Sequence, residues 1–369
     1  MPRRAATGAV RVAEVGLSLE HLLETLIESE PFERLLLSRD RPVAARAEAG
    51  EDFLIAGLAA SLATPILAVT AGPHEADALG PSLEAWLGPE RVAVLPAWEA
   101  LPYEGISPSP EVAARRADAV ARLRGAKGAF VVVAPALAAM QGLIPTLGAV
   151  PPLELVPGAE LPPDALAERL VELGYTRSDI VERRGEFAVR GGVADIFPGT
   201  ARRPVRLEYL GDEVESIREF VPSTQLSSRS VVVARVPPVR EFVVDEEVRT
   251  RAAALAPEMT DRIRDGLQRL ADGLHAEGAE SLAPLVFDHL PTPAELLPEG
   301  SWVVLTQATR TQDRARQAFE EADALANALA WPGPPAIRPL EQALADHVQL
   351  HLSEFTEGES SGLASWGSA

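Results

Sequence analysis

Cysteine is absent from the 369 residues, and lysine occurs once, at Lys127. Without cysteine the chain has no disulfide, no thiol nucleophile and no cysteine-ligated zinc or iron–sulfur site. No stretch of about eighteen residues is free of charged and turn residues, so no transmembrane helix is predicted. The first residues also lack the long apolar run of a secretory signal, so we expect a cytoplasmic protein.

Positive charge is scarce as well. The chain has 34 Lys and Arg against 54 Asp and Glu, a formal net charge of −20 at pH 7. A protein that binds duplex DNA presents a basic face that displaces counterions from phosphates, so this chain as a whole is expected to repel DNA. Hydrophobic residues make up 47% of the composition and charged residues 24%, which is typical of a globular protein rather than a disordered one.

A phosphate-binding P-loop is also missing. That loop, G-x-x-x-x-G-K-[ST], holds phosphates with glycine amides and a lysine, and holds magnesium with a hydroxyl. The segment in the corresponding place has Ala45 for the first glycine, keeps Gly50, and has Glu51 and Asp52 for the lysine and the hydroxyl residue. Two carboxylates would repel a triphosphate by roughly several kcal/mol. The segment is either a degenerate P-loop or was never one; in both cases we expect no ATP site and no cofactor.

Other catalytic patterns are not found. His347 and His351 are the only two of the six histidines with i, i+4 spacing, and they fall in a predicted strand rather than on a helix, so we predict no metal site. The glycines from Gly185 to Gly192 lie within a predicted hairpin and not between a strand and a helix, so they do not form a dinucleotide-binding loop. The sequence therefore predicts no catalytic residues.

The first 150 residues are typical of an α/β domain. Short apolar runs at 66–69, 92–95 and 130–133 predict buried parallel strands, and an amphipathic helix over 112–123 precedes the third. After about residue 221 the mixed pattern returns. Its predicted elements are helices along 259–270 and 315–329 and strands at 302–305 and 348–352.

Residues 151–220 follow a different pattern. The run Pro162-Pro163-Asp164 predicts the start of a short helix that ends at Gly174. Two later segments alternate apolar and polar residues around 191–192 and 211–212, which predicts two β-hairpins. The predicted fold is an α/β protein, with a degenerate P-loop-type parallel sheet split by a small β-rich insertion. The predicted boundaries are 1–150 and 221–355 for the split domain, 151–220 for the insertion and 356–369 for a tail or linker.

Two stretches carry a family resemblance: LPAWEALPYEGISPSPEVAARRADAVARL and ERRGEFAVRGGVADIFPGTARRPVRLEYLGDEVESIREF. The second is the more specific, because RG-x-x-x-D-IFP followed by RLEYLGDE-x-E-S-I-R is hard to produce by chance. Together they resemble the start of the bacterial transcription-repair coupling factors and, more distantly, UvrB. The resemblance implies a module that binds the damage sensor UvrA. It also implies that this chain is a fragment, because RNA polymerase and DNA would be bound by a family remainder that is absent here.

The resemblance further implies three UvrA contacts. Two are arginines, Arg190 and Arg206, and the third falls on Leu210, where the family has an aromatic residue. This departure puts the aromatic part of the interface in question. Tyr209, one residue earlier, is predicted to point to the opposite face of its strand.

The local charge agrees with a docking role. Residues 176–206 hold seven arginines against four carboxylates, in a chain of net charge −20. Arginine is suited to bidentate, charge-assisted bonds with a partner's carboxylates. The alternative is that these arginines form solvated pairs with Glu186 or Glu208 on neighbouring strands.

Three functions therefore compete. The favoured one is a non-catalytic module that recruits UvrA; the others are a nucleic-acid-binding repair component of the UvrB type and an unrelated α/β enzyme. Arg116, on the helix of the first domain, is taken as an arginine remote from the docking surface and hence as a control position.

Overall fold

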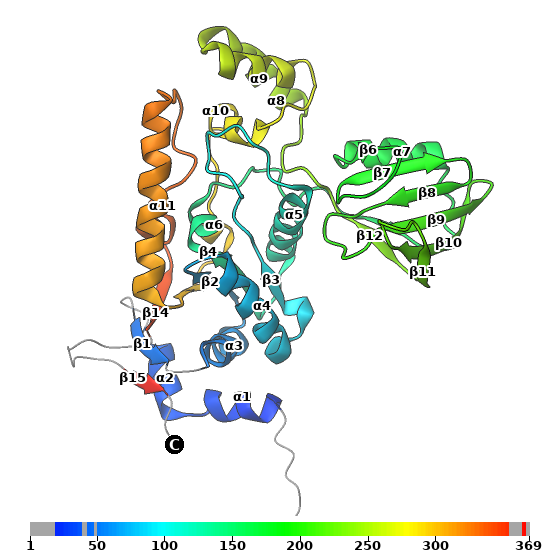
Figure 1. Ribbon diagram of the computed structural model, residues 1–369. Helices are drawn as coiled ribbons and strands as arrows, with labels where there is room; N and C mark the ends of the chain where they lie inside the picture. The colour runs from blue at the N-terminus through cyan, green and yellow to red at the C-terminus, as the bar shows by residue number, and fades with distance from the viewer. Residues whose placement is uncertain (1–18, 39–42, 48–49, 354–363, 367–369) are drawn as a thin grey trace, which may run out of the picture.

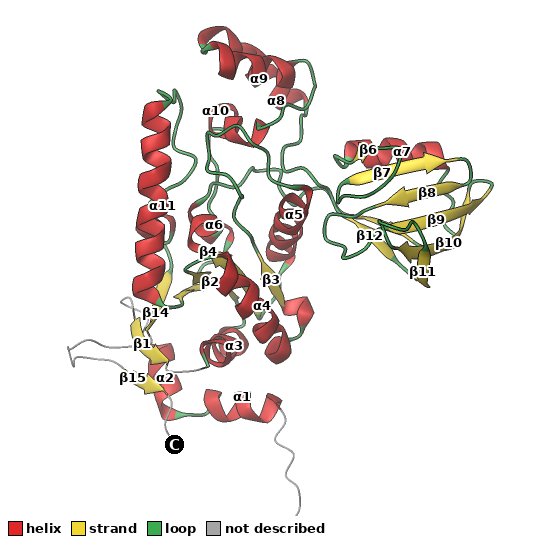
Figure 2. Ribbon diagram, in the orientation of Figure 1, coloured by secondary structure: helices red, strands yellow, loops and turns green. Residues whose placement is uncertain are grey.

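The computed structural model describes residues 19–38, 43–47, 50–353 and 364–366, which form two unequal parts (Figure 1). The larger part has a parallel β-sheet with helices on both sides, and the smaller part protrudes from it as a mostly antiparallel sheet with one helix, in which only β6 (Thr176–Arg177) and β7 (Glu186–Arg190) pair in parallel (Figure 2). The predicted fold class is confirmed. The domain boundaries stay a prediction, and of the predicted tail, residues 356–363 and 367–369 lie outside the described residues.

The sheet of the larger part has seven strands, all parallel, in the order β15-β1-β14-β13-β2-β4-β3. The strands are β1 (Val43–Ala47), β2 (Pro65–Thr70), β3 (Val92–Val94), β4 (Phe130–Pro135), β13 (Trp302–Leu305), β14 (Val348–Ser353) and β15 (Ala364–Trp366). The α-helices are α1 (Leu19–Ile27), α2 (Glu30–Leu37), α3 (Glu51–Leu62), α4 (Pro73–Leu87), α5 (Pro110–Gly125), α6 (Ala136–Met140), α8 (Glu246–Leu255), α9 (Asp261–Ala271), α10 (Ala283–Val286), α11 (Ala308–Ala328) and α12 (Leu340–Ala343). The 3-10 helices are η1 (Pro89–Arg91), η2 (Ala256–Glu258), η3 (Ala279–Leu282) and η4 (Ala294–Leu296).

The apolar runs form strands because both faces of this sheet are covered. Every residue of β2 and of β4 is buried. Along β4, Val131 and Val133 pack into one core cluster with α3 and α4, whereas Val132 packs into a second cluster with α5 and α6. A strand buried on both faces needs apolar residues at consecutive positions, and this requirement explains the unbroken run in the sequence.

The smaller part contains a six-stranded sheet in the order β11-β10-β9-β8-β7-β6, with α7 packed on one face. Its elements are α7 (Pro163–Glu172), β6 (Thr176–Arg177), β7 (Glu186–Arg190), β8 (Val193–Ile196), β9 (Val205–Leu210), β10 (Glu213–Phe220) and β11 (Ser227–Ser230). Both predicted hairpins are confirmed. Their turns contain Gly191 and Gly211 at φ of 58° and 65°, in the left-handed region that glycine tolerates best.

A two-stranded antiparallel sheet connects the two parts. In it, β5 (Leu153–Leu155), where the chain enters the smaller part, pairs with β12 (Ala234–Val236), where the chain leaves it. Two ion pairs also cross to α5: Arg184 lies 3.1 Å from Glu111, and Arg235 lies 3.4 Å from Asp118. The outgoing and returning segments are therefore held side by side against the larger part.

Arg116 differs from the expectation. It is fully buried on α5, where its Nε donates to Glu241 over 2.6 Å and its Nη1 donates to the carbonyl of Pro96 and to Oε1 of Gln141. Trp98 donates its indole N–H to the same Glu241 oxygen. Arg116 is therefore unsuitable as a control position, because it is buried where the chain returning from the smaller part covers this face of α5.

Candidate docking face

The residues that the family resemblance singles out lie on one face of the six-stranded sheet. In the register, Asp195 on β8 pairs with Arg206 on β9, and Arg190 ends the neighbouring β7. Alternation along a strand places Arg206 and Leu210 on the same face and Tyr209 on the other. Tyr209 packs against the core cluster that includes α7, whereas Leu210 is 74% exposed. The predicted orientation of Tyr209 is confirmed.

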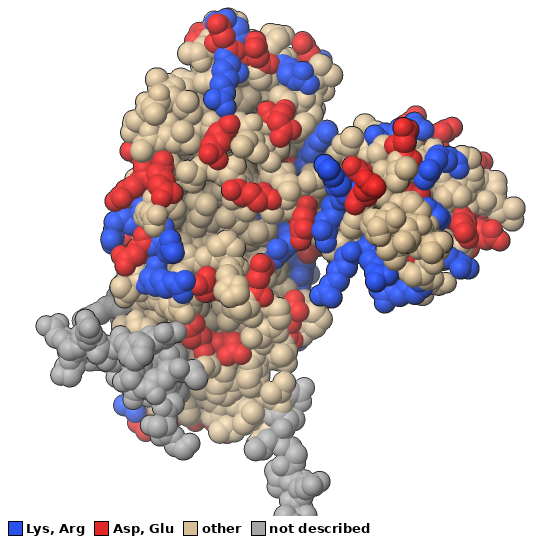
Figure 3. All heavy atoms as spheres, in the orientation of Figure 1, with Lys and Arg blue, Asp and Glu red and all other residues tan. Residues whose placement is uncertain are grey.

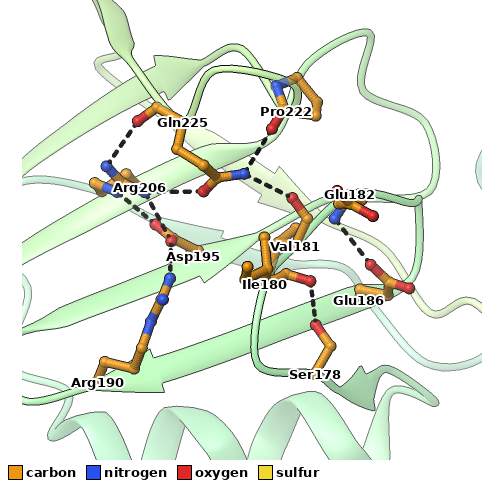
Figure 4. A network of polar contacts seen from close by, with 10 residues as sticks. All are labelled: Ser178, Ile180, Val181, Glu182, Glu186, Arg190, Asp195, Arg206, Pro222 and Gln225. Atoms are coloured by element: carbon orange, nitrogen blue, oxygen red, sulfur yellow. Dashed lines mark hydrogen bonds and ion pairs between the residues drawn. The ribbon is translucent and has the colours of Figure 1, made fainter.

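A single carboxylate joins the two arginines (Figure 4). Asp195 accepts two hydrogen bonds from Arg206, from Nε at 2.7 Å and from Nη2 at 2.9 Å, and a third from Nη2 of Arg190 at 3.0 Å. The Asp195 side chain is 1% exposed, so this carboxylate is removed from water. A buried charge is tolerated when it is paired and hydrogen-bonded, and three charge-assisted bonds meet this condition.

Arg206 is built into the sheet. Its Nη1 donates to the main-chain carbonyl of Gln225, its Nη2 also reaches Oε1 of Gln225, and its guanidinium lies 4.8 Å from the ring centroid of Phe220. The hydrogen bonds that Arg206 donates to Asp195 raise the pKa of the Arg206 guanidinium. Gln225 has a left-handed backbone, at φ of 58°, and its side-chain amide donates to the carbonyls of Val181 and Pro222. The turn after β10 therefore fixes the position of Arg206.

Arg190 is much more accessible than Arg206. The exposed fraction of its side chain is 54%, compared with 19% for Arg206. Together with Leu210, Arg190 presents a cationic group and an apolar group to solvent from the same face. The arrangement suits a partner that offers a carboxylate beside an apolar side chain.

Sequence reasoning missed two residues of this face, Asp195 and Gln225. The alternative, in which Arg190 and Arg206 pair with Glu186 or Glu208, is not observed: both arginines pair with Asp195, whereas Glu186 accepts from main-chain N–H groups of its own loop and Glu208 accepts from Ser216. Asp195 was within reach of sequence reasoning. A two-residue turn at 191–192 sets the register and puts Asp195 on the same face as Arg190.

Basic side chains gather on the smaller part and along its flank next to the larger part (Figure 3). That flank borders a cleft of about 770 Å³ whose lining includes Arg183, Arg184, Arg240 and Glu280. Burial raises the pKa of Glu280 to about 7, and its carboxylate accepts a hydrogen bond from the Ser107 hydroxyl over 2.7 Å. The lining of this cleft contains both arginines and glutamates, so it lacks the single sign of charge that would select an ionic ligand.

Gly50, Glu51 and Asp52, the residues of the predicted degenerate nucleotide site, lie together at the start of α3. Gly50 precedes the helix with φ of 86°, and Glu51 and Asp52 form its first turn. Asp52 accepts a hydrogen bond from the indole N–H of Trp86 over 3.0 Å, and Glu51 accepts one from the main-chain N–H of Gln307 over 3.3 Å. A helix N-terminus attracts anions, and here two carboxylates already lie in the first turn, where their negative charge opposes a phosphate. Residues 48–49 of this segment lie outside the described residues.

We predict that this chain does not bind ATP, because Glu51 and Asp52 repel phosphates and no lysine stands at this helix. Calorimetric titration with Mg-ATP should give no saturable heat at micromolar concentrations. The matched variant, Glu51→Lys with Asp52→Thr, removes the repulsion and restores the P-loop side chains. Micromolar binding by the unmodified chain that this variant leaves unchanged would contradict the prediction.

The two histidines with metal-ligand spacing do not converge. Nε2 of His347 contacts the carbonyl of Ala294, and Nε2 of His351 contacts the side chain of Gln349. Throughout the described ranges, no group of three or more histidine, aspartate or glutamate side chains has the geometry to hold a metal ion. In the same part of the chain, no helix has both the length and the hydrophobicity needed to cross a membrane.

Comparison with known proteins places this face within a recognised unit. Residues 153–242 match the family described as the UvrB interaction domain, a segment that contains the whole six-stranded sheet and both connecting strands. The transcription-repair-coupling factor of Mycobacterium tuberculosis is 35% identical over 91% of this chain. Those of Myxococcus xanthus and Bacillus subtilis are 32% and 29% identical over 86% and 83% of it. The chain spans 28% of the length of each of these curated relatives. Over most of its own length the chain is thus similar to the transcription-repair-coupling factors, of which it spans 28%, and it contains a segment that matches the UvrB interaction domain.

Proposed function

We propose that this chain is a protein-docking module that recruits UvrA in transcription-coupled nucleotide excision repair. The observation that carries the proposal is the coincidence of the UvrB interaction domain, residues 153–242, with the sheet that presents Arg190 and Leu210 on one outer face. Arg190 offers hydrogen-bond donors for a carboxylate of UvrA, and the apolar Leu210 lies on the same face.

We also propose that the module is non-catalytic. Two carboxylates, Glu51 and Asp52, lie in the first turn of α3 at the predicted degenerate nucleotide site. Asp52 is hydrogen-bonded to Trp86, and Glu51 to Gln307. The relatives extend beyond the 28% of their length that this chain spans, and we propose that ATP-driven translocation along DNA and contact with RNA polymerase belong to those further regions of the family.

The alternative is a nucleic-acid-binding component of the UvrB type. The UvrB interaction domain favours it, whereas the net charge of −20 and the missing P-loop lysine count against it. A gel shift with duplex DNA at physiological salt separates the two, since the alternative requires affinity tighter than the roughly micromolar limit of non-specific binding.

Direct titration of UvrA with the purified chain tests the proposal. A saturable complex is expected, and its affinity should fall as salt rises because charge-assisted contacts are screened. A chain that is folded by circular dichroism and still fails to bind UvrA at any salt concentration would refute the docking function.

Leu210→Phe restores an aromatic residue at the third family contact. Because Leu210 is 74% exposed, the larger ring fits without repacking the core, and we expect UvrA binding to stay equal or to strengthen by about 1 kcal/mol. Leu210→Asn, which removes apolar area from the same exposed position, is the matched variant and should weaken binding. Clear weakening by Leu210→Phe would show that the interface is shaped around leucine.

A further inference from the structure

We infer that Asp195 is a positioning residue for partner docking: it holds Arg190 in place through a carboxylate that it shares with Arg206. This inference rests on the proposed function and goes beyond it, because it gives the two arginines different roles. Arg190 is the group that meets the partner, and Arg206 is part of the frame that holds it.

The donor count of Arg206 supports the framing role. A guanidinium has five N–H donors. In Arg206, Nε and Nη2 serve Asp195, and Nη1 and the second Nη2 hydrogen serve Gln225, so that four of the five are engaged. With a side chain 19% exposed, Arg206 has little left to offer a partner.

Arg190, in contrast, uses only one of its hydrogen-bond donors within the described part of the chain. One N–H donates to Asp195 over 3.0 Å, and among the described residues its other donors have no hydrogen-bond acceptor. Its side chain is 54% exposed. A carboxylate of the partner can therefore take two donors of Arg190 while the bond to Asp195 keeps the guanidinium in place. Pre-organisation of this kind reduces the entropy lost on binding.

The position of Asp195 explains why one residue controls both arginines. It lies on β8, between the strands that carry Arg190 and Arg206, and its Oδ2 accepts from both guanidinium groups. Without its negative charge, two cationic groups would face each other over a site that is 1% exposed, and Arg190 would turn away. The three side chains Arg190, Arg206 and Asp195 together carry one net positive charge, which suits an anionic partner group.

The test is a double-substitution cycle measured by calorimetry against UvrA. Asp195→Asn keeps the shape of the side chain but removes its charge, and we expect it to weaken binding about tenfold, the scale of coupling within one ion-pair network. Arg190→Ala alone should weaken binding more. The double variant should bind within about twofold of Arg190→Ala, because Asp195 acts through Arg190.

The matched control is Glu219→Gln, which neutralises a strand carboxylate that pairs with Arg229 over 2.7 Å on the neighbouring β11. It should leave UvrA binding unchanged. Asp195→Asn with full affinity, or a double variant in which the two losses multiply, would overturn the positioning role while leaving the docking function intact. Failure of the unmodified chain to bind would instead reject the docking function itself.

A second variant covers the case in which Asp195→Asn does not fold. Arg206→Lys keeps the positive charge beside Asp195 but loses the bidentate geometry. The inference requires that it weaken binding when Arg190 is present and have no further effect when Arg190 is alanine. An equal loss in both backgrounds would overturn the inference, because Arg206 would then act on the partner independently.

Discussion

Arg190→Ala is expected to weaken UvrA binding by about 2–5 kcal/mol, or about thirty- to several-thousand-fold in affinity. The loss is large because truncation would leave a carboxylate of the partner buried in the interface without its cation. A solvated surface pair would lose less than about 1 kcal/mol. Calorimetric titration distinguishes the two ranges, and thermal melting of the variant should stay close to that of the unmodified chain, since the Arg190 side chain is 54% exposed.

Arg169→Ala is the matched control for this result. Arg169 is an exposed arginine on α7, on the far side of the same sheet, and it pairs with Glu172 over 2.7 Å. Arg206→Ala should differ from both, with weaker binding and also a lower melting temperature, because it removes two bonds from the buried Asp195. Unchanged affinity in Arg190→Ala, with the fold intact, would refute the assignment of this face.

Arg116→Met is expected to lower the free energy of unfolding by about 3–5 kcal/mol, because it leaves Glu241 fully buried without its cation. Chemical denaturation measures this loss. The adjacent Arg115, whose pair with Asp77 is partly exposed, is the matched control, and Arg115→Ala should cost less than about 1 kcal/mol. A similar cost for both substitutions would contradict the role of the buried pair.

The loss in Arg116→Met should depend on pH. Burial raises the pKa of Glu241 above its ordinary value of 4.5, and Arg116 and the Trp98 indole act to lower it. Without Arg116 the pKa of Glu241 rises further. A group whose pKa is raised on folding stabilises the protein below its unfolded pKa and loses that contribution as pH rises through the folded value. The deficit of the variant should therefore be smallest near pH 4.5 and grow toward neutral pH.

A double substitution distinguishes the loss of the ion pair itself from the cost of leaving one buried charge without its partner. Arg116 Nη2 and Glu241 Oε2 are buried and, within the described ranges, have no hydrogen-bond partner, so the network is only partly satisfied. Replacing both groups by apolar residues is then expected to cost less than removing one. Arg116→Met combined with Glu241→Leu should recover much of the stability lost in the single variant.

The hairpins and buried strands were predictable because local rules determine them. A glycine pair such as 191–192 sets the register of a hairpin, and an apolar run such as 130–133 demands burial on both faces. Arg116 was not predictable, because its burial depends on Glu241, which is 125 residues away in sequence. An arginine on a helix is normally solvent-exposed, and only tertiary structure reveals the acidic residue that overrides this preference.

The candidate face was predictable in part for the same reason. Alternation and turn register place Arg190, Asp195 and Arg206 on one face, but the different engagement of the two arginines depends on Gln225, in a turn after the last hairpin strand. No local pattern predicts that Gln225, with φ of 58°, accepts hydrogen bonds from Arg206 on another strand. The family resemblance located both arginines, and the geometry separates their roles.

The pairing of β5 with β12 has a consequence for the order in which the chain folds during synthesis. All strands of the smaller sheet fall within 176–230, an uninterrupted stretch that emerges from the ribosome before residue 302. The parallel sheet, in contrast, needs β13 beside β2 and β14 beside β1, so it stays incomplete until β14, which ends at Ser353, has been made. The smaller sheet, whose two ends are joined by the pairing of β5 with β12, can therefore fold first, before strands β13 and β14 of the parallel sheet have been synthesised.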